Sequence, residues 1–299
     1  MTQSNVFDTE ILTAIEQQLD HLLTRPAQPA AAGLERIYAA MRYSALAGGK
    51  RLRPYLTVLA ADLFDVPRSQ SIRAGSAIEL IHCYSLIHDD LPAMDDSDLR
   101  RGRATSHIEF DDATAVLAGD ALLTEAFAVL ADAATHPVPE VRTILVSQLA
   151  MAAGPMGMVG GQMMDIMAET GMAAAEDIAL IQSLKTGALI AVSCRFGAYL
   201  AQAGQPETDA LQRFAADIGL AFQITDDLLD VSGSAAQTGK PTGQDAMNSK
   251  PTFVDLLGET GAREKAATLI EDAKQALAVF SPRQEPLARI ADFILSRQS

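Results

Sequence analysis

Apolar residues recur at helical spacing along almost the whole 299-residue chain. The pattern is clear in TEILTAIEQQLDHLL near the N-terminus, in AGSAIELIHCYSLI, and in TDALQRFAADIGLAFQITDDLLDV towards the C-terminus. Side chains three and four positions apart share one face of a helix, so each segment has an apolar face to bury. No segment shows the two-residue alternation of a strand, and alanine and leucine, which favour helices, are abundant. The sequence therefore predicts an all-α protein.

The breaks between the predicted helices are short. They read TRPAQPAAA, FDVPRSQ, THPVPE, AGQPET and FSPRQEP, with the proline, glycine and polar residues that end helices. None is long enough to serve as a linker, so we expect one domain over residues 1–299. A single long polar stretch, residues 232–252, interrupts the pattern, and such a segment in a helical domain is usually functional or disordered.

The formal net charge of −15 restricts the possible partners. Nucleic acid and anionic membrane surfaces require a basic face that neutralises phosphates, so we expect neither as a general partner. An acidic protein that binds anionic substrates must use local basic clusters, or metal ions held by carboxylates.

The N-terminal segment lacks a basic region followed by an apolar one, and we find no uninterrupted apolar stretch of about 20 residues. We therefore expect no signal peptide and no membrane span. The only cysteines, Cys83 and Cys194, lie in apolar helical patterns and are predicted to be buried, reduced thiols. These features favour a cytoplasmic protein.

Five aspartates gather in LIHDDLPAMDDSDLRRGR, residues 86–103. Asp89 and Asp90 end an apolar helical run, Pro92 discourages its continuation, and Asp95 follows the break. A helix N-cap would explain one or two of the five. The remainder suit a hard cation, because Mg²⁺ takes one or two carboxylates together with water and substrate phosphates.

A second group of carboxylates lies in FQITDDLLD, where Asp226 and Asp230 share a helix face and Asp227 is offset by about 100°. Taken alone, this group is typical of a solvated acidic face. Because two separate helices end in similar clusters, we expect both to point at a common place.

Basic residues supply the complementary charge. AGGKRLRP, residues 47–54, places Lys50, Arg51 and Arg53 before a predicted helix, and Arg100 and Arg101 follow the first aspartate group. Guanidinium groups bind phosphate bidentately and helix starts offer free N–H groups. A surface basic patch is the alternative interpretation of this stretch, but in so acidic a chain we favour an anion site.

These motifs, in this order, resemble one family. YSALAGGKRLRP, LIHDDLPAMDDSDLRRGRATSH, LAGDALLTEAF, GGQMMDI, KTGALI, FQITDDLLD and GKPTGQDAMNSKPTFVDLLG together cover nearly the whole chain. The chain resembles the trans-isoprenyl diphosphate synthases, or polyprenyl synthetases, and most of all the bacterial short-chain farnesyl diphosphate synthases.

The resemblance implies a helical bundle around a deep central cavity, usually as a homodimer, with the two aspartate motifs facing each other. It implies condensation of isopentenyl diphosphate with an allylic diphosphate, using three Mg²⁺ ions. The implied metal ligands are Asp89, Asp95 and Asp226, with Asp90, Asp227 and Asp230 nearby. The implied allylic diphosphate residues are Arg100, Lys185, Thr186, Gln223, Lys240 and Lys250, and those for isopentenyl diphosphate are Gly49, Lys50, Arg53, His82 and Arg101.

By the same resemblance, Arg100, Lys185 and Lys240 stabilise the departing diphosphate, and an allylic carbocation forms in an apolar cavity. The isopentenyl double bond attacks it, and the proton passes to the released diphosphate. The segment from Lys240 to Lys250 is expected to lack order without substrate and to fold over bound diphosphate. His82 taken alone would more often be a satisfied core histidine, yet it lies two helical turns before Asp89 on the same face.

Product length in this family depends on the cavity wall. Tyr84, five residues before Asp89, occupies the position of an aromatic floor, with Ser85 beside it. Together with the insert LPAM in the first motif, Tyr84 implies a fifteen-carbon product. LIQSL before Lys185 departs from the family pattern in lacking a histidine.

Four alternatives remain open at this point. A geranylgeranyl diphosphate synthase would share every diphosphate residue, and a catalytically silent partner subunit would keep the fold. A terpene cyclase would replace the second aspartate motif, and an acidic calcium-binding protein would have no use for the paired basic sites.

Overall fold

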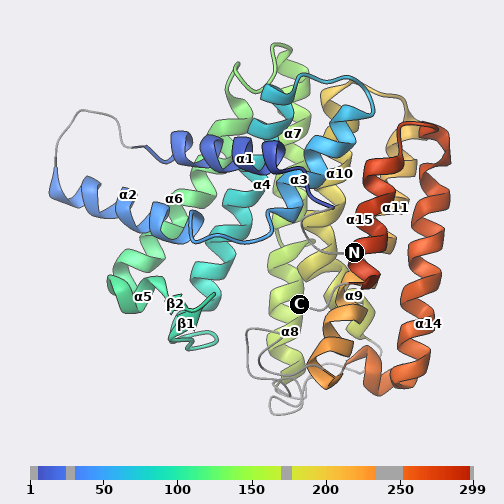
Figure 1. Ribbon diagram of the computed structural model, residues 1–299. Coiled ribbons are helices and arrows are strands. Elements are labelled where there is room, and N and C mark those ends of the chain that lie inside the picture. Colours follow the sequence, from blue (N-terminus) through green and yellow to red (C-terminus); the bar gives the residue numbers. More distant parts are fainter. Residues whose placement is uncertain (1–5, 25–30, 170–176, 233–251, 297–299) are drawn as a thin grey trace. The chain divides into compact units, whose positions relative to one another are not determined.

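The computed structural model describes residues 6–24, 31–169, 177–232 and 252–296. Regular structure in these ranges is almost entirely helical, which confirms the all-α prediction (Figure 1). The longer helices are α1 (Thr9–Leu22), α2 (Ala32–Ala45), α3 (Leu52–Asp62), α4 (Arg68–Asp89), α6 (Asp112–Ala131), α7 (Pro139–Ala153), α8 (Met158–Glu169), α10 (Ala188–Leu200), α11 (Gln205–Ser232), α14 (Phe253–Ala276) and α15 (Glu285–Ser296). Shorter elements are α5 (Ser106–Glu109), α9 (Ile178–Gln182), the π-helix η3 (Ser183–Gly187) and the 3₁₀-helix η4 (Leu277–Phe280).

The chain divides into two compact units, which are described one at a time. The N-terminal unit comprises Phe7–Val58 and Pro67–Val146, and the C-terminal unit comprises Met1–Val6, Leu59–Val66 and Ser147–Ser299. The expectation of one domain over residues 1–299 stays a prediction.

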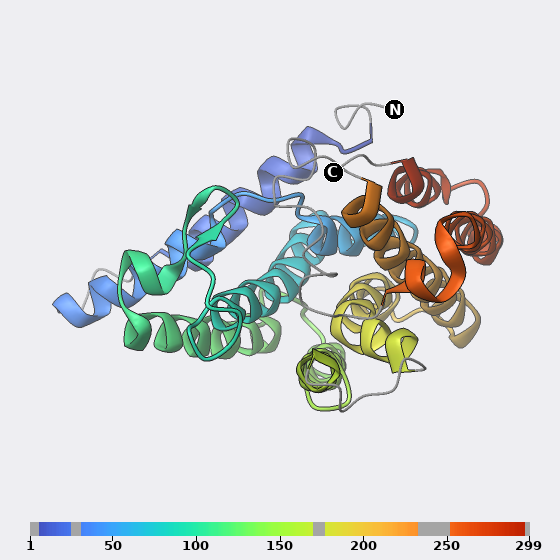
Figure 2. The same ribbon diagram turned by 90° about the horizontal axis from the view of Figure 1, so that it is seen from below.

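In the N-terminal unit, α4 is the central helix. Its apolar residues are buried on several faces, and it packs against α1, α2 and α6. Figure 2 shows α4 and α6 side by side. Gly75 lets α4 touch the chain at the start of α3, because a Cβ atom there would lie 2.8 Å from the Cα of Pro54. The last turn of α4 carries the first two aspartates and is therefore held rigidly by the core beneath it.

In the C-terminal unit, α11 packs against α10 and α14, and α15 covers both α11 and α14. Phe196 and Phe214 are fully buried between these helices. Helix α14 begins with a capping box, in which Thr252 and Asp255 satisfy each other's backbone N–H groups. The cap fixes the start of α14, which packs beside α11.

The structure corrects the expectation that strands are absent. Leu99–Arg100 (β1) pairs antiparallel with Arg103–Ala104 (β2), with Leu99 opposite Ala104. Arg101 and Gly102 both have positive φ angles, 54° and 75°, as the tight turn of a hairpin requires. Two-residue strands are too short to produce an alternation in the sequence. This hairpin turns Arg100 and Arg101 back towards the end of α4.

Three helical stretches are apolar and long enough, by length and composition alone, to cross a membrane. They are Asp112–Ala131, Pro139–Ala168 and Ile178–Leu200. The search for uninterrupted apolar runs in the sequence missed them, so the absence of a membrane span stays a prediction. Cys83 and Cys194 are buried free thiols, as expected, and burial raises the pKa of Cys83 to about 12.

Candidate active site

The C-terminal end of α4 presents the first aspartate group. Asp89 is the last residue of the helix, and the chain then folds back so that the backbone N–H of Asp95 donates to the carbonyl of Asp89 at 2.8 Å. Asp89 is half-buried and Asp95 is exposed. The turn thus brings the backbones of the two predicted metal ligands together at the rim of the N-terminal unit.

Asp90 has a different environment from Asp89. It is buried, and both carboxylate oxygens accept from Nε of Arg100, at 2.9 and 2.8 Å, while Nη2 of Arg100 lies 2.7 Å from Oδ1. Burial alone lowers the pKa of Arg100, but the bonds to Asp90 and the charges of Asp89 and Asp95 outweigh it and raise the pKa. In this arrangement Asp90 holds Arg100 beside the metal-ligand candidates.

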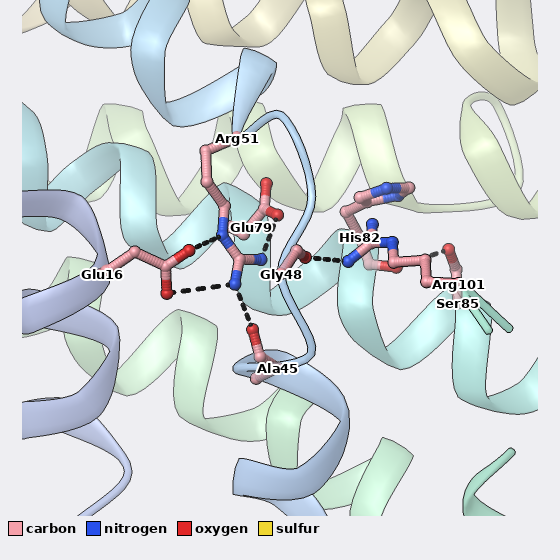
Figure 3. A network of polar contacts seen from close by, with 8 residues as sticks. All are labelled: Glu16, Ala45, Gly48, Arg51, Glu79, His82, Ser85 and Arg101. Atoms are coloured by element: carbon pink, nitrogen blue, oxygen red, sulfur yellow. Dashed lines mark hydrogen bonds and ion pairs between the residues drawn. The ribbon is translucent and has the colours of Figure 1, made fainter. Parts of the chain in front are cut away.

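The loop between α2 and α3 forms the basic half of the site. Gly48 and Gly49 have positive φ angles of 80° and 123°, which glycine adopts without strain. A Cβ atom on Gly49 would lie 2.8 Å from the guanidinium of Arg101, whose Nη1 donates to the carbonyl of Gly48 (Figure 3). The guanidinium of Arg101 therefore lies directly against Gly49, and the expected contact of Gly49 with isopentenyl diphosphate stays a prediction. Lys50 is exposed on this loop.

His82 and Arg53 lie in a strongly positive environment. Burial lowers the pKa of His82 well below its ordinary value of 6.5, and the charges of Arg53, Arg101 and Arg100 lower it further. Burial also lowers the pKa of Arg53, and its Nε has no hydrogen-bond partner among the described residues. A buried donor without a partner costs free energy, so this concentration of cations is complementary to an anion.

Arg51 differs from its basic neighbours. It is buried and ion-paired to Glu16 and Glu79, so its guanidinium is not available to the anion site that the sequence predicted for Lys50, Arg51 and Arg53. The sequence offered no signal for these partners, because Glu16 lies on α1 and Glu79 on α4.

Tyr84 is buried one turn and a half below Asp89. Its ring packs edge-on against His88, with ring centroids 5.7 Å apart, and Nε2 of His88 lies 3.1 Å from the carbonyl of Val116 on α6. A Cβ atom on Gly119 would lie only 2.1 Å from that Nε2, so the glycine makes room for the imidazole. Sequence reasoning found Tyr84 but missed His88 and Gly119. Ser85 donates to the carbonyl of His82 at 3.0 Å.

In the C-terminal unit, Lys185 and Thr186 lie in the π-helix η3. Such turns often occur at functional sites, because they change which way side chains face. Nζ of Lys185 lies 2.5 Å from Oδ2 of Asp165 on α8. A Cβ atom on Gly161 would lie 2.2 Å from the backbone nitrogen of Lys185, which explains why the second residue of GGQMMDI is glycine. Asp165 is a further site residue that this motif signals and that the prediction left out.

In the second aspartate group, as in the first, one carboxylate is buried and hydrogen-bonded while its neighbours are partly exposed. Asp227 is buried; its Oδ1 accepts from Gln223 at 2.9 Å, and its Oδ2 accepts from the backbone N–H of Phe253 at 2.8 Å. Asp226 and Asp230 are half-buried on α11.

A cavity of about 160 Å³ is lined by Asp165, Lys185, Thr186, Gln223, Asp227 and Thr252. Lys240 and Lys250 lie outside the described residues.

Within the described ranges, no three carboxylate, imidazole or thiol side chains form a ready metal cage. The donors nonetheless fit Mg²⁺, which commonly binds through one or two carboxylates and substrate phosphates. Asp89 and Asp95 offer such oxygens beside cationic side chains that accept the rest of a diphosphate's charge.

The sequence matches a model of the polyprenyl synthetase family over residues 34–281. The chain belongs to the polyprenyl synthetase family. It is 43% identical over 294 residues to the farnesyl diphosphate synthase of Escherichia coli (strain K12), covering 96% of this chain and 97% of that protein. It is also 43% identical over 266 residues to a chloroplastic geranylgeranyl pyrophosphate synthase of Capsicum annuum, covering 88% and 72%.

The fold is also similar to that of a solved structure. The apo FPP/GFPP synthase of Zymomonas mobilis is 42% identical, with a TM-score of 0.85 over 96% of this chain and 97% of that one. The isoprenyl synthase resemblance is therefore confirmed. Because farnesyl and geranylgeranyl enzymes are equally identical to this chain, overall identity does not discriminate between their products.

Proposed function

We propose that this chain is a Mg²⁺-dependent farnesyl diphosphate synthase. It joins isopentenyl diphosphate head to tail with dimethylallyl and then geranyl diphosphate, and releases pyrophosphate at each step. The observation that carries the proposal is the pair of cations Arg53 and Arg101 around His82, beside the aspartate-bearing end of α4, in a chain with a net charge of −15. Near-full-length similarity to farnesyl diphosphate synthases supports it.

The basic loop holds the diphosphate of isopentenyl diphosphate. Arg53 and Arg101 donate to its oxygens, Lys50 adds a mobile charge, and His82 donates a hydrogen bond in its neutral form. This diphosphate is not cleaved in the reaction, so direct side-chain contacts are sufficient to position it. The double bond is thereby aimed at the allylic carbon.

The allylic diphosphate is bound by Arg100, Lys185, Thr186, Gln223, Lys240 and Lys250. Asp89, Asp95 and Asp226 would hold Mg²⁺, expected as three ions, and the bound metal would supply positive charge to the leaving diphosphate. Asp90 holds Arg100 and Asp165 holds Lys185 in ion pairs, so little reorganisation of these two side chains is needed as negative charge develops on the diphosphate. The new bond joins the isopentenyl double bond to the allylic carbon, and the proton lost afterwards passes to the released pyrophosphate.

Product length is limited by Tyr84 and its support. The ring of Tyr84 is held against His88, which is wedged between α4 and α6 by the space at Gly119. A growing chain that passes beneath Asp89 meets this wall, with Ser85 leaving some room beside it. A fifteen-carbon product is therefore favoured over a twenty-carbon one.

We also propose that the protein is a cytoplasmic homodimer. The side chain of Leu117 on α6 is 58% exposed, and Val116 and Ile108 nearby on the N-terminal unit are exposed as well. An exposed apolar group of this kind fits a protein interface. A second copy of this chain covers it, in place of lipid.

The test is to incubate the purified chain with dimethylallyl diphosphate, labelled isopentenyl diphosphate and Mg²⁺, with and without a chelator, and to size the dephosphorylated products. A chelator-sensitive fifteen-carbon alcohol is expected. A twenty-carbon product would assign the chain to the geranylgeranyl synthases, and no product from the chain alone would point to a silent partner subunit.

A further inference from the structure

The guanidinium of Arg51 lies at the centre of a charge cluster formed by Glu16, Arg51 and Glu79, in which Arg51 and Glu79 are buried and Glu16 is partly exposed. Nε and Nη2 of Arg51 donate to Oε1 and Oε2 of Glu16 at 2.6 and 3.2 Å, and Nη1 donates to Oε1 of Glu79 at 2.8 Å. Nη2 also donates to the carbonyl of Ala45 at 2.7 Å. Figure 3 shows the two carboxylates on different sides of the guanidinium. Arg51 is only 3% exposed, so it is not itself available to a diphosphate.

The cluster closes the loop that carries the isopentenyl diphosphate residues. Ala45 is the last residue of α2, and Arg51 immediately precedes α3, so the bond from Arg51 to the carbonyl of Ala45 joins the two ends of the loop. Arg101 fixes its middle by donating to the carbonyl of Gly48. The loop is thus held by two guanidinium groups, one on its buried side and one on its substrate side.

The backbone of this loop requires such support. Arg51 has a φ of 48°, in the left-handed region that a branched or bulky residue adopts at a cost. With Gly48 and Gly49, this makes three left-handed residues within four positions. If the side chain of Arg51 loses its partners, the hold on the buried side of the loop is lost and its φ can relax, so we expect the directions of Lys50 and Arg53 on either side to change with it.

The cluster also contributes charge. Glu16 and Glu79 carry two negative charges against the single positive charge of Arg51, which leaves one in excess. Burial lowers the pKa of Arg53, and the charge of Glu79 opposes this effect. Glu79 lies one turn before His82 on α4, so the excess negative charge lies on the protein side of the cationic group. It favours Arg53 as a cation without occupying the face that a diphosphate approaches.

We propose that Glu16, Arg51 and Glu79 are positioning residues for the isopentenyl diphosphate site, which they set through the loop from Leu46 to Arg51; this rests on the proposed function. Their effect is specific to one of the two substrates. Within the part of the chain that the structure describes, none of the three forms a hydrogen bond or ion pair with Arg100, the residue of the same unit that is proposed to bind the allylic diphosphate.

The test uses Glu16→Gln in the full chain. It keeps the size of the side chain and removes its charge, and at 39% side-chain exposure it leaves no fully buried polar group unpaired. The expected result is a KM for isopentenyl diphosphate raised about tenfold, corresponding to ~1.4 kcal/mol, with the KM for geranyl diphosphate within about twofold of wild type. The matched control is Asp20→Asn, which breaks the surface ion pair of Asp20 and Arg42 between the same helix α1 and helix α2. It is expected to change neither KM.

Equal effects of Glu16→Gln on both KM values, or a lower kcat with both KM values unchanged, would overturn the proposal, because general loosening of the fold acts on both substrates. If Glu16→Gln does not fold, Arg51→Lys gives the same comparison, since an ammonium cannot bridge two carboxylates and a carbonyl as the planar guanidinium does.

Calorimetric titration with isopentenyl diphosphate alone separates this proposal from the proposed function. A wild-type chain that binds isopentenyl diphosphate in this titration but forms no product when geranyl diphosphate and Mg²⁺ are added would refute the synthase activity, and a Kd about tenfold weaker in Glu16→Gln would still support the positioning role. An unchanged Kd in Glu16→Gln, or no binding of isopentenyl diphosphate by the wild-type chain, would overturn the positioning role.

Discussion

Replacing Asp90 with asparagine separates two roles for the second aspartate of the first motif. In the structure the carboxylate of Asp90 is bound by Nε and Nη2 of Arg100, so we expect its role to be the orientation of that guanidinium. The alternative is direct metal coordination alongside Asp89. The two roles predict different changes in the kinetics.

The magnitude follows from the burial of the pair. The side chain of Asp90 is 5% exposed and that of Arg100 is 26% exposed. Breaking a fully buried ion pair costs about 3–5 kcal/mol. The cost is smaller here, because Arg100 is partly hydrated and asparagine keeps one acceptor oxygen. We therefore expect Asp90→Asn to lower the free energy of unfolding by about 2 kcal/mol. A misdirected Arg100 loses charge-assisted hydrogen bonds to the allylic diphosphate, worth roughly 1.5–3 kcal/mol, or about 10- to 100-fold in kcat/KM.

The assay measures kcat/KM for geranyl diphosphate over a range of Mg²⁺ concentrations, for Asp90→Asn, Arg100→Met and the double variant. A coupling of about 1–3 kcal/mol is expected between the two substitutions, with the Mg²⁺ concentration at half-maximal activity unchanged. Asp98→Asn, which removes an exposed carboxylate from the same segment, is the charge-matched control. Additive effects, together with a many-fold higher Mg²⁺ requirement in Asp90→Asn, would refute this reasoning and make Asp90 a metal ligand.

Three further predictions concern α4 and α6. Because burial and neighbouring arginines lower the pKa of His82 below 6.5, the unfolded chain binds more protons below that pH, and stability falls as the pH drops from 6.5 towards the folded pKa. In urea unfolding, the free energy of unfolding should fall by at most about 1.4 kcal/mol between pH 6.5 and 5.5, and His82→Asn should abolish this fall. If the variant shows the same pH dependence as the wild type, other groups cause it. Gly119→Ala places a methyl group 2.1 Å from Nε2 of His88, so we expect about 1–3 kcal/mol of destabilisation by thermal unfolding, and an unchanged Tm would contradict the packing. Tyr84→Ala opens the wall and should give products longer than fifteen carbons by chromatography, whereas unchanged fifteen-carbon output would remove Tyr84 as the floor.

The order of the helices and the placement of both aspartate groups at helix ends were predictable from the sequence. Helical periodicity is a local signal that repeats over many residues, and proline and glycine mark where each helix ends. The small hairpin at Leu99–Ala104 was not predictable, because two residues per strand do not establish a period.

The sequence by itself determined the residue types of the site, carboxylates for metal and basic groups for diphosphate, and their spacing along the chain. Only the tertiary structure decided which member of each neighbouring pair is buried and which partner holds it. Asp90, Asp227 and Arg51 are buried in ion pairs or hydrogen bonds, whereas the adjacent Asp89, Asp226 and Lys50 are at least partly exposed. Adjacent residues on a helix point about 100° apart, so burial of one or the other depends on which helix packs there. That choice is made by partners distant in sequence, such as Glu16 for Arg51 and Phe253 for Asp227, and no local pattern encodes it.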